Sequence, residues 1–319
     1  MTKRYITYIS AILLPVTVAT LLAWFGNGLR EPFDPPLALW EKPVLEAVEF
    51  RSVDDMESYF RKVSYTWIPA SGASVPPIEV SAIPADISKV KEVSRKKSIF
   101  FRALLPLVLE ENDLILRQQS KLLALQLKSF DQWTPNEHLW FSELLDWYRL
   151  PIQSPDQVLF SELLARVDSI PTELVLAQAA NESGWGTSRF ARIGNNLFGM
   201  WTFNDKNGLI PKQRAKGEKH AVQVFASLRE SVRAYMRNLN THKAYQSLRE
   251  SRMRSREQGK ELDGRLLAQG LLRYSIRGKD YVDELQSMIR TNQLATVRAV
   301  SLRLAQEGLD SEFPQRTKL

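Results

Sequence analysis

The stretch Pro171–Gly184 (PTELVLAQAANESG) decides the fold that we expect for this chain. Proline at its start and glycine at its end are typical helix boundaries, so the stretch predicts a short helix. Its side chains are apolar on most sides, which indicates a helix buried in a mainly helical domain. One carboxylate, Glu182, stands in the last turn. The spacing of Val175, Ala179 and Glu182 directs that carboxylate to the side that faces the core.

Glu182 is therefore a candidate general acid. Removal from water and the negative end of the helix dipole both disfavour its charged form. Both effects raise the pKa of the carboxyl group toward the range that a general acid needs near neutral pH. The alternative is a buried or helix-capping glutamate that is held by hydrogen bonds and does no chemistry.

The residues after Glu182 form a candidate binding segment. Gly184 and Gly186 flank Trp185 and permit a tight turn that opens the end of the helix to solvent. The run 194–201 (GNNLFGMW) then combines glycines with amide and aromatic side chains. Amides hydrogen-bond hydroxyl groups and aromatic rings pack on apolar faces, so the segment suits a neutral, hydroxyl-rich ligand.

The signature E-S-G-W-G-T-S…A-R-x-G-N-N-L-F-G-x-W over residues 182–201 resembles the glucosaminidase-type peptidoglycan hydrolases of glycoside hydrolase family 73, and above all the bacterial Bax family. The resemblance covers about residues 96–292 and is densest over 176–203. It implies a mainly α, lysozyme-like helical domain with a small β-hairpin. It also implies cleavage of the β-1,4 bond after N-acetylglucosamine in peptidoglycan glycan strands, with no cofactor and no metal.

Site residues follow from the resemblance position by position. Glu182 matches the family's general acid, and the family's hairpin acid would fall in Gly208–Phe225, whose only carboxylate is Glu218. Tyr274 matches a tyrosine that orients the substrate or the oxocarbenium-like transition state. A solvated loop charge and an ordinary half-buried tyrosine are the alternatives for Glu218 and Tyr274. The implied substrate-binding residues are Trp185, Asn195, Asn196, Leu197, Phe198, Trp201 and Tyr281.

Two mechanisms remain open at this point. One is inversion, in which a distant base activates water; the other is substrate assistance, in which the N-acetyl group attacks the anomeric carbon. We favour substrate assistance because the acyl group is already tethered at the right distance. A lytic transglycosylase of lysozyme-like fold and a non-catalytic peptidoglycan-binding protein are the alternative functions.

The composition narrows the chemistry further. The 319 residues include no cysteine, which excludes disulfides, iron–sulfur clusters and a thiol nucleophile. The three histidines lie far apart in the sequence, which argues against a metal centre. The net charge of +7 favours an anionic partner, and no nucleic-acid-binding motif is present. The charged run 249–265 alternates in sign at helical spacing, which indicates a solvated face, with contact to anionic glycan stems or phospholipid heads as the alternative.

The N-terminal segment predicts where the chain works. Ile6–Phe25 (ITYISAILLPVTVATLLAWF) carries no charge, and about 20 apolar residues span a bilayer core as a helix. Lys3 and Arg4 precede this segment, which places the N-terminus in the cytoplasm. We expect a single-pass anchor in the bacterial inner membrane and a periplasmic catalytic domain. The alternative is a signal peptide that is cleaved, which releases the domain into the periplasm.

Four segments are expected along the chain. A signal-anchor helix occupies residues 1–29, and a proline-rich linker or poorly defined region occupies residues 30–95. The glucosaminidase-like catalytic domain covers residues 96–300, and a tail covers residues 301–319. Pro106 should kink or restart the first helix of the catalytic domain.

Overall fold

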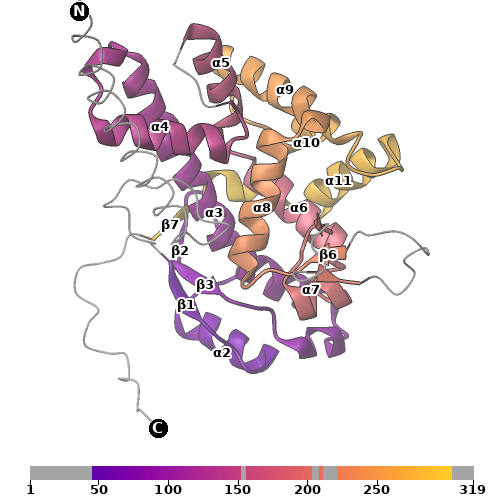
Figure 1. Cartoon of the computed structure of the whole chain (residues 1–319). Coiled ribbons are helices and arrows are strands. Elements are labelled where there is room, and N and C mark those ends of the chain that lie inside the picture. The colour runs from indigo at the N-terminus through magenta and orange to yellow at the C-terminus, as the bar shows by residue number, and fades with distance from the viewer. Residues whose placement is uncertain (1–44, 152–155, 203–207, 211–220, 304–319) are drawn as a thin grey trace, which may run out of the picture. The chain divides into compact units, whose positions relative to one another are not determined.

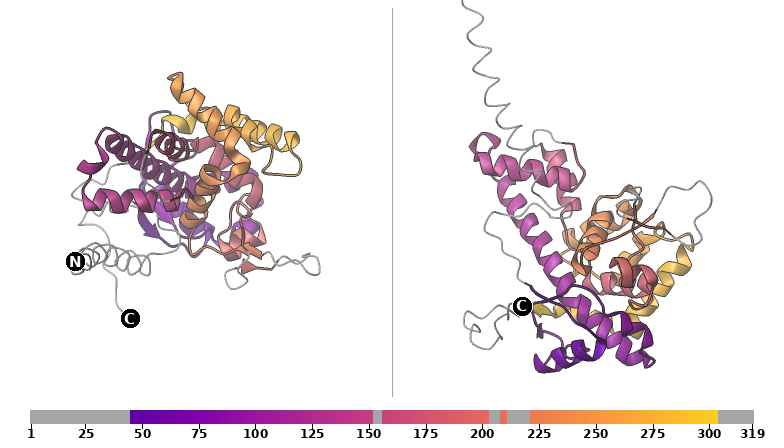
Figure 2. Two further views of the ribbon diagram at one scale, coloured as in Figure 1. Left: turned by 45° about the horizontal axis from the view of Figure 1, so that its top comes forward. Right: turned by 60° about the horizontal axis from the view of Figure 1, so that its bottom comes forward.

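One long helix, α3 (Val93–Gln126), is the element around which the described residues assemble (Figure 1). The computed structural model describes residues 45–151, 156–202, 208–210 and 221–303. Helix α2 and its neighbouring strands gather at one end of α3, and α4 lies at the other end (Figure 2). Helices α6 (Thr172–Ser183) and α8 (Leu228–Thr241) pack extensively against α3.

The described elements are mainly helical, as the sequence predicts, and fit a lysozyme-like α domain. All of them fall within one compact unit of the chain. Before α3 come β1 (Glu46–Val48), α2 (Val53–Lys62), β2 (Ser74–Val75), β3 (Ile78–Val80) and the 3₁₀ helix η1 (Ala85–Lys89). After α3 come η2 (Phe130–Gln132), α4 (Pro135–Trp147), α5 (Gln157–Arg166), α6, α7 (Arg189–Gly194), β4 (Trp201–Thr202), β5 (Gly208–Leu209), β6 (Ala221–Gln223), α8, η4 (Lys243–Tyr245), α9 (Gln246–Glu257), α10 (Gly264–Leu267), η5 (Ala268–Leu271), α11 (Lys279–Thr291), η6 (Leu294–Ala299) and β7 (Ser301–Leu302).

Helix α3 continues through Pro106, so of the two outcomes expected there, a kink or a restart, the restart does not occur. Leu105 and Leu107 on either side of Pro106 are fully buried. Proline removes one backbone hydrogen bond, but burial of a continuous apolar run offsets that loss. Tertiary packing therefore keeps one helix where the proline alone would have permitted a restart.

Residues 45–92 are ordered elements rather than the expected linker. β1 pairs in parallel with β3, with Glu46 opposite Ile78, and β2 pairs in parallel with β7, with Ser74 opposite Ser301. The proline-rich stretch contributes buried Ile78 and Val80 to the core. A proline at the start of a strand leaves the pairing of that strand intact, so a proline-rich sequence does not exclude strands here.

The expected hairpin within Gly208–Phe225 is present as an antiparallel pair of β5 and β6, and β4 extends it to a three-stranded sheet with the order β4-β6-β5. Glu218, which stands between β5 and β6 in the sequence, lies outside the described residues, as does Ile6–Phe25. Among the helices of the described ranges, none combines the length and the hydrophobicity needed to cross a bilayer.

Candidate active site

Helix α6 places Glu182 at the boundary between core and solvent. The helix is buried along most of its length, whereas Glu182 in its last turn is partly exposed. Gly184 ends the helix in the left-handed conformation, with φ +55°, which glycine adopts without strain. The Ser183 hydroxyl donates to the Ala179 carbonyl at 2.6 Å and accepts from the Gly186 N–H at 2.8 Å, which closes the turn under the carboxylate.

Helix α11 supplies the partner of Glu182. The hydroxyl of Tyr281 donates a hydrogen bond of 2.7 Å to Oε1 of Glu182. Burial raises the pKa of the Glu182 carboxyl, and the Tyr281 hydrogen bond opposes part of this rise. The charge of Glu284 raises the pKa further and that of Arg277 lowers it. The direction agrees with the expectation for a general acid.

A series of aromatic side chains leads away from Tyr281. Tyr274 and Tyr281 stack with ring centroids 5.5 Å apart and planes 2° from parallel. The Tyr274 hydroxyl donates to the Phe198 carbonyl at 2.9 Å, and Phe198 stacks on Tyr235 at 3.9 Å. Burial raises the pKa of the Tyr274 and Tyr235 hydroxyls well above their ordinary value, so both stay neutral hydrogen-bond donors. The structure thus links Tyr281, the partner of Glu182, to Tyr274 and through it to Phe198.

The two predicted asparagines bind backbone groups of the chain itself. Asn195 is left-handed, with φ +49°, and its amide donates to the carbonyls of Phe225 and Ala226 at 3.2 Å. Asn196 is buried; its Nδ2 donates to the carbonyls of Met200 at 2.9 Å and Gln223 at 2.8 Å, and its Oδ1 accepts from the Met200 N–H. These amides tie the segment after α7 to β6.

The other predicted binding residues divide by exposure. Leu197 is fully buried in the core. The Trp185 indole packs edge-on against Phe100 and Phe101 of α3, with the Lys97 ammonium 4.8 Å above its ring. Trp201 on β4 is 54% exposed, so it presents aromatic surface to solvent.

Two residues of the site were missed by the sequence prediction. Gln178, one turn before Glu182 on α6, is fully buried and hydrogen-bonds both Tyr281 and Tyr235. A signal for Gln178 was available, since it is a lone amide within an apolar helix run. Tyr235 lies on α8, far from Gln178 in sequence, and nothing in the sequence pairs the two.

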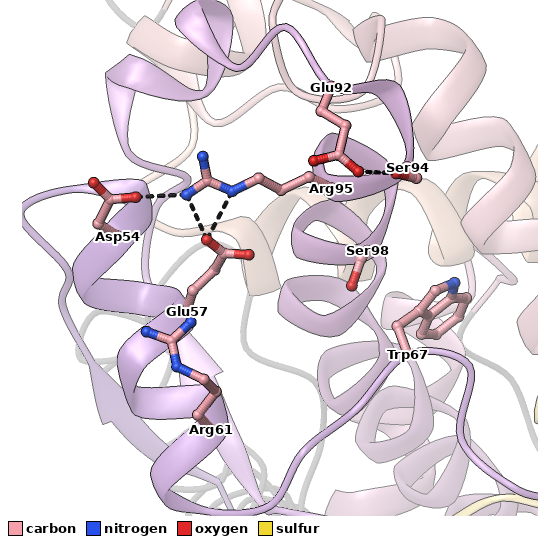
Figure 3. Close-up of a pocket in the computed structure, with 8 residues that line it drawn as sticks. All are labelled: Asp54, Glu57, Arg61, Trp67, Glu92, Ser94, Arg95 and Ser98. Atoms are coloured by element: carbon pink, nitrogen blue, oxygen red, sulfur yellow. Dashed lines mark hydrogen bonds and ion pairs between the residues drawn. The ribbon is translucent and has the colours of Figure 1, made fainter.

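The cavity shown in Figure 3 lies elsewhere. It measures about 690 Å³ and is open; Asp54, Glu57, Arg61, Trp67, Glu92, Ser94, Arg95 and Ser98 line it. Arg95 bridges Asp54 and Glu57 at 2.5 Å, an arrangement that fastens α2 to the start of α3. Glu182 does not line this cavity. Within the described part of the chain, no group of three His, Asp or Glu side chains could hold a metal ion.

Comparisons with known proteins bear on this helical domain and on the glutamate at the end of α6. The family model described as mannosyl-glycoprotein endo-beta-N-acetylglucosaminidase matches residues 159–294, which include Glu182, Tyr274 and Tyr281. Protein bax of Escherichia coli (strain K12) is 35% identical over 214 residues, which cover 67% of this chain and 75% of that relative. The chain therefore belongs to the Bax-like glucosaminidase family. No solved structure was found to match it.

Proposed function

We propose that this chain is a peptidoglycan hydrolase that cleaves the β-1,4 glycosidic bond after N-acetylglucosamine, with Glu182 as the general acid. One observation carries the proposal: a partly exposed carboxyl at the end of a buried helix, whose pKa burial raises, lies inside the region that matches the glucosaminidase family. A carboxyl of this kind stays protonated to higher pH than a solvated one and can donate its proton to a leaving oxygen.

The surrounding groups support the same chemistry. When Glu182 gives up its proton, the Tyr281 hydroxyl at 2.7 Å already points at the carboxylate and stabilises the new charge. Tyr274 stacks on Tyr281, and its hydroxyl is held by the Phe198 carbonyl. We assign Tyr274 a supporting role in orienting the substrate, and Trp201 a stacking contact with a sugar ring.

For the attack on the anomeric carbon we propose substrate assistance: the N-acetyl oxygen bonds to this carbon as the leaving oxygen takes the proton of Glu182, and water then opens the resulting ring. Among the described residues, the carboxylate whose charge reaches Glu182 is Glu284, and it is paired with Arg277 at 2.5 Å. This ion pair already engages the Glu284 carboxylate, which favours the N-acetyl group of the substrate as the attacking group. Inversion with Glu218 as the base is the alternative.

Product analysis tests the proposed bond and reaction. Purified sacculi are digested with the full chain, and the soluble products are identified by mass spectrometry. Reducing N-acetylglucosamine ends are the expected result. Anhydromuramic ends would instead identify a lytic transglycosylase, and tight binding to sacculi without soluble products would identify a non-catalytic binding protein.

Location is part of the proposal. The uncharged stretch Ile6–Phe25 would hold the domain on the periplasmic side of the inner membrane, where peptidoglycan lies. Fractionation of cells tests this: the full chain should remain with membranes after a high-salt wash. Recovery in the soluble periplasmic fraction would show that the stretch is cleaved.

A further inference from the structure

A chain of buried hydrogen bonds leads from Glu182 into the core. Tyr281 donates to Oε1 of Glu182 at 2.7 Å, and Nε2 of Gln178 donates to the Tyr281 hydroxyl oxygen at 2.8 Å. The Tyr235 hydroxyl in turn donates to Oε1 of Gln178. Gln178 and Tyr235 are fully buried and Tyr281 nearly so. The three residues come from α6, α8 and α11, so the chain also joins three helices.

Tyr235, at the buried end of this series of hydrogen bonds, fixes which group donates and which accepts along it. Tyr235 is buried and has one proton to donate, which the Gln178 carbonyl oxygen accepts. If the Gln178 amide were turned over, its NH₂ group would face Tyr235, and the Tyr235 proton would lose this acceptor. The observed orientation therefore places an N–H, never a carbonyl, against Tyr281. The proton of Tyr281 is left free to point at Glu182.

We propose that Gln178 is a positioning residue that, together with Tyr235, holds Tyr281 as a hydrogen-bond donor to Oε1 of Glu182 and so assigns the transferable proton to Oε2. The inference rests on the proposed role of Glu182 as general acid. Gln178 and Tyr235 are buried, so a substrate reaches neither, and hydrogen bonds link both to Glu182 through Tyr281. Hydrogen bonds in series polarise one another, so Tyr281 donates more strongly when Gln178 donates to it.

Other charged and titratable groups also act on Glu182. Tyr274, Tyr235 and Tyr245 are neutral hydroxyls whose own pKa is raised by burial and by the charge of Glu182. Glu284 and Arg277 act with opposite signs from α11 and the segment before it. On the other elements packed against α6, Arg298 of η6 pairs with Glu173 at the far end of α6, and Lys97 of α3 lies over Trp185. Apart from Tyr235, none of these groups is changed by the variants below.

The test is the titration of Glu182 in the full chain, followed by NMR of glutamate labelled at the side-chain carboxyl carbon. The Glu182→Gln variant assigns the signal. Tyr281→Phe removes the donor and should raise the pKa of Glu182 by about one unit, which is a tenfold change in the protonation equilibrium. Gln178→Met and Tyr235→Phe should raise it by less. Gln178→Met should add little in a Tyr281→Phe background, because Gln178 reaches Glu182 through the Tyr281 hydroxyl.

A matched control exists elsewhere in the fold. The Tyr148 hydroxyl donates to Oε1 of Gln118 at 2.8 Å, and both side chains are buried. Gln118→Met and Tyr148→Phe therefore remove a buried Tyr–Gln pair of the same kind without touching α6. These two variants should leave the titration of Glu182 unchanged. If Gln178→Met fails to fold, Tyr235→Phe, which keeps its ring stacked on Phe198, carries the test.

The same variants give a second measurement on sacculi. Gln178→Met should lower kcat with little effect on KM, and the loss of activity at high pH should move upward with the pKa of Glu182. An unchanged titration in both Gln178→Met and Tyr235→Phe, or shifts that simply add, would overturn the inference. The titration does not depend on turnover, so failure of the proposed function leaves this inference testable, and the reverse also holds.

Discussion

Replacing Asn196 with alanine tests whether the family's asparagine segment is first of all a structural element. The Asn196 side chain makes four hydrogen bonds: Nδ2 donates to the carbonyls of Met200 and Gln223, and Oδ1 accepts from the N–H groups of Phe198 and Met200. The side chain is 2% exposed, so water cannot replace these partners in an unchanged fold. The substitution would leave backbone groups of the segment between α7 and β6 unpaired.

The magnitude follows from those contacts. A buried polar group that loses its partner destabilises the fold by about 1–3 kcal/mol, and relaxation of the segment recovers part of the sum. We therefore expect Asn196→Ala to lower the free energy of unfolding by about 3 kcal/mol. Asn195→Gly is the matched control. It keeps the left-handed backbone and loses two longer hydrogen bonds at a partly exposed site, so the expected loss is below about 1 kcal/mol.

Urea unfolding of the full chain, followed by circular dichroism, measures both variants against the wild type. A loss in Asn196→Ala no larger than that in Asn195→Gly would refute the structural assignment. It would return Asn196 to direct contact with substrate. An Asn196→Ala variant that is as stable as the wild type but no longer binds sacculi would also show that Asn196 contacts the substrate.

Three further predictions follow from burial and charge. Because burial raises the pKa of Glu182 above its unfolded value of about 4.5, the stability that this group contributes is complete below that value and is lost as pH rises through the folded pKa. Glu182→Gln should therefore melt at a higher temperature than the wild type at about pH 8 and at a similar temperature at about pH 4; a lower melting temperature at pH 8 would contradict this. Arg252→Met should lower the free energy of unfolding by about 3 kcal/mol or more, because buried Arg252 donates to several carbonyl groups and its Nε lies 3.4 Å from the Asp168 carboxylate. The control Arg254→Met, on the exposed face of the same helix, should change that free energy by less than about 0.5 kcal/mol. Urea titration measures both variants. Trp201→Ala should leave the urea midpoint within error and weaken sedimentation with sacculi, since its ring is 54% exposed; a large loss of stability would show that Trp201 is a core residue instead.

Local signals predicted the helices that carry recognisable ends. Thr134, Pro135 and Glu137 have the residue types typical of a helix start and begin α4, with a capping box in which Glu137 accepts from the Thr134 N–H at 2.8 Å. Gly184 ends α6 as expected. These signals are local because a cap satisfies backbone groups within one turn of itself. The position of Glu182 at the end of a buried helix was predictable for the same reason.

Features that depend on contacts with residues distant in the sequence were not predicted. The expected solvated face of residues 249–265 is wrong at Arg252, which is 1% exposed and donates to the carbonyls of Ala165, Asp168 and Ser169. Charge alternation along a helix reports nothing about the carbonyl groups that another segment presents to it. The sequence prediction missed Tyr235 for the same reason, because Tyr235 acts through a hydrogen bond to Gln178 on α6, which is distant in the sequence.

The most direct test of the central claim is the activity of Glu182→Gln on purified sacculi, beside Glu250→Gln as a control from the exposed face of α9. Both variants of the full chain are first shown to be folded by circular dichroism. If Glu182 gives up the proton, Glu182→Gln should release reducing N-acetylglucosamine ends about a hundred- to ten-thousandfold more slowly than the wild type, and Glu250→Gln should match the wild type. Release by folded Glu182→Gln at the wild-type rate would contradict the assignment of Glu182 as the general acid.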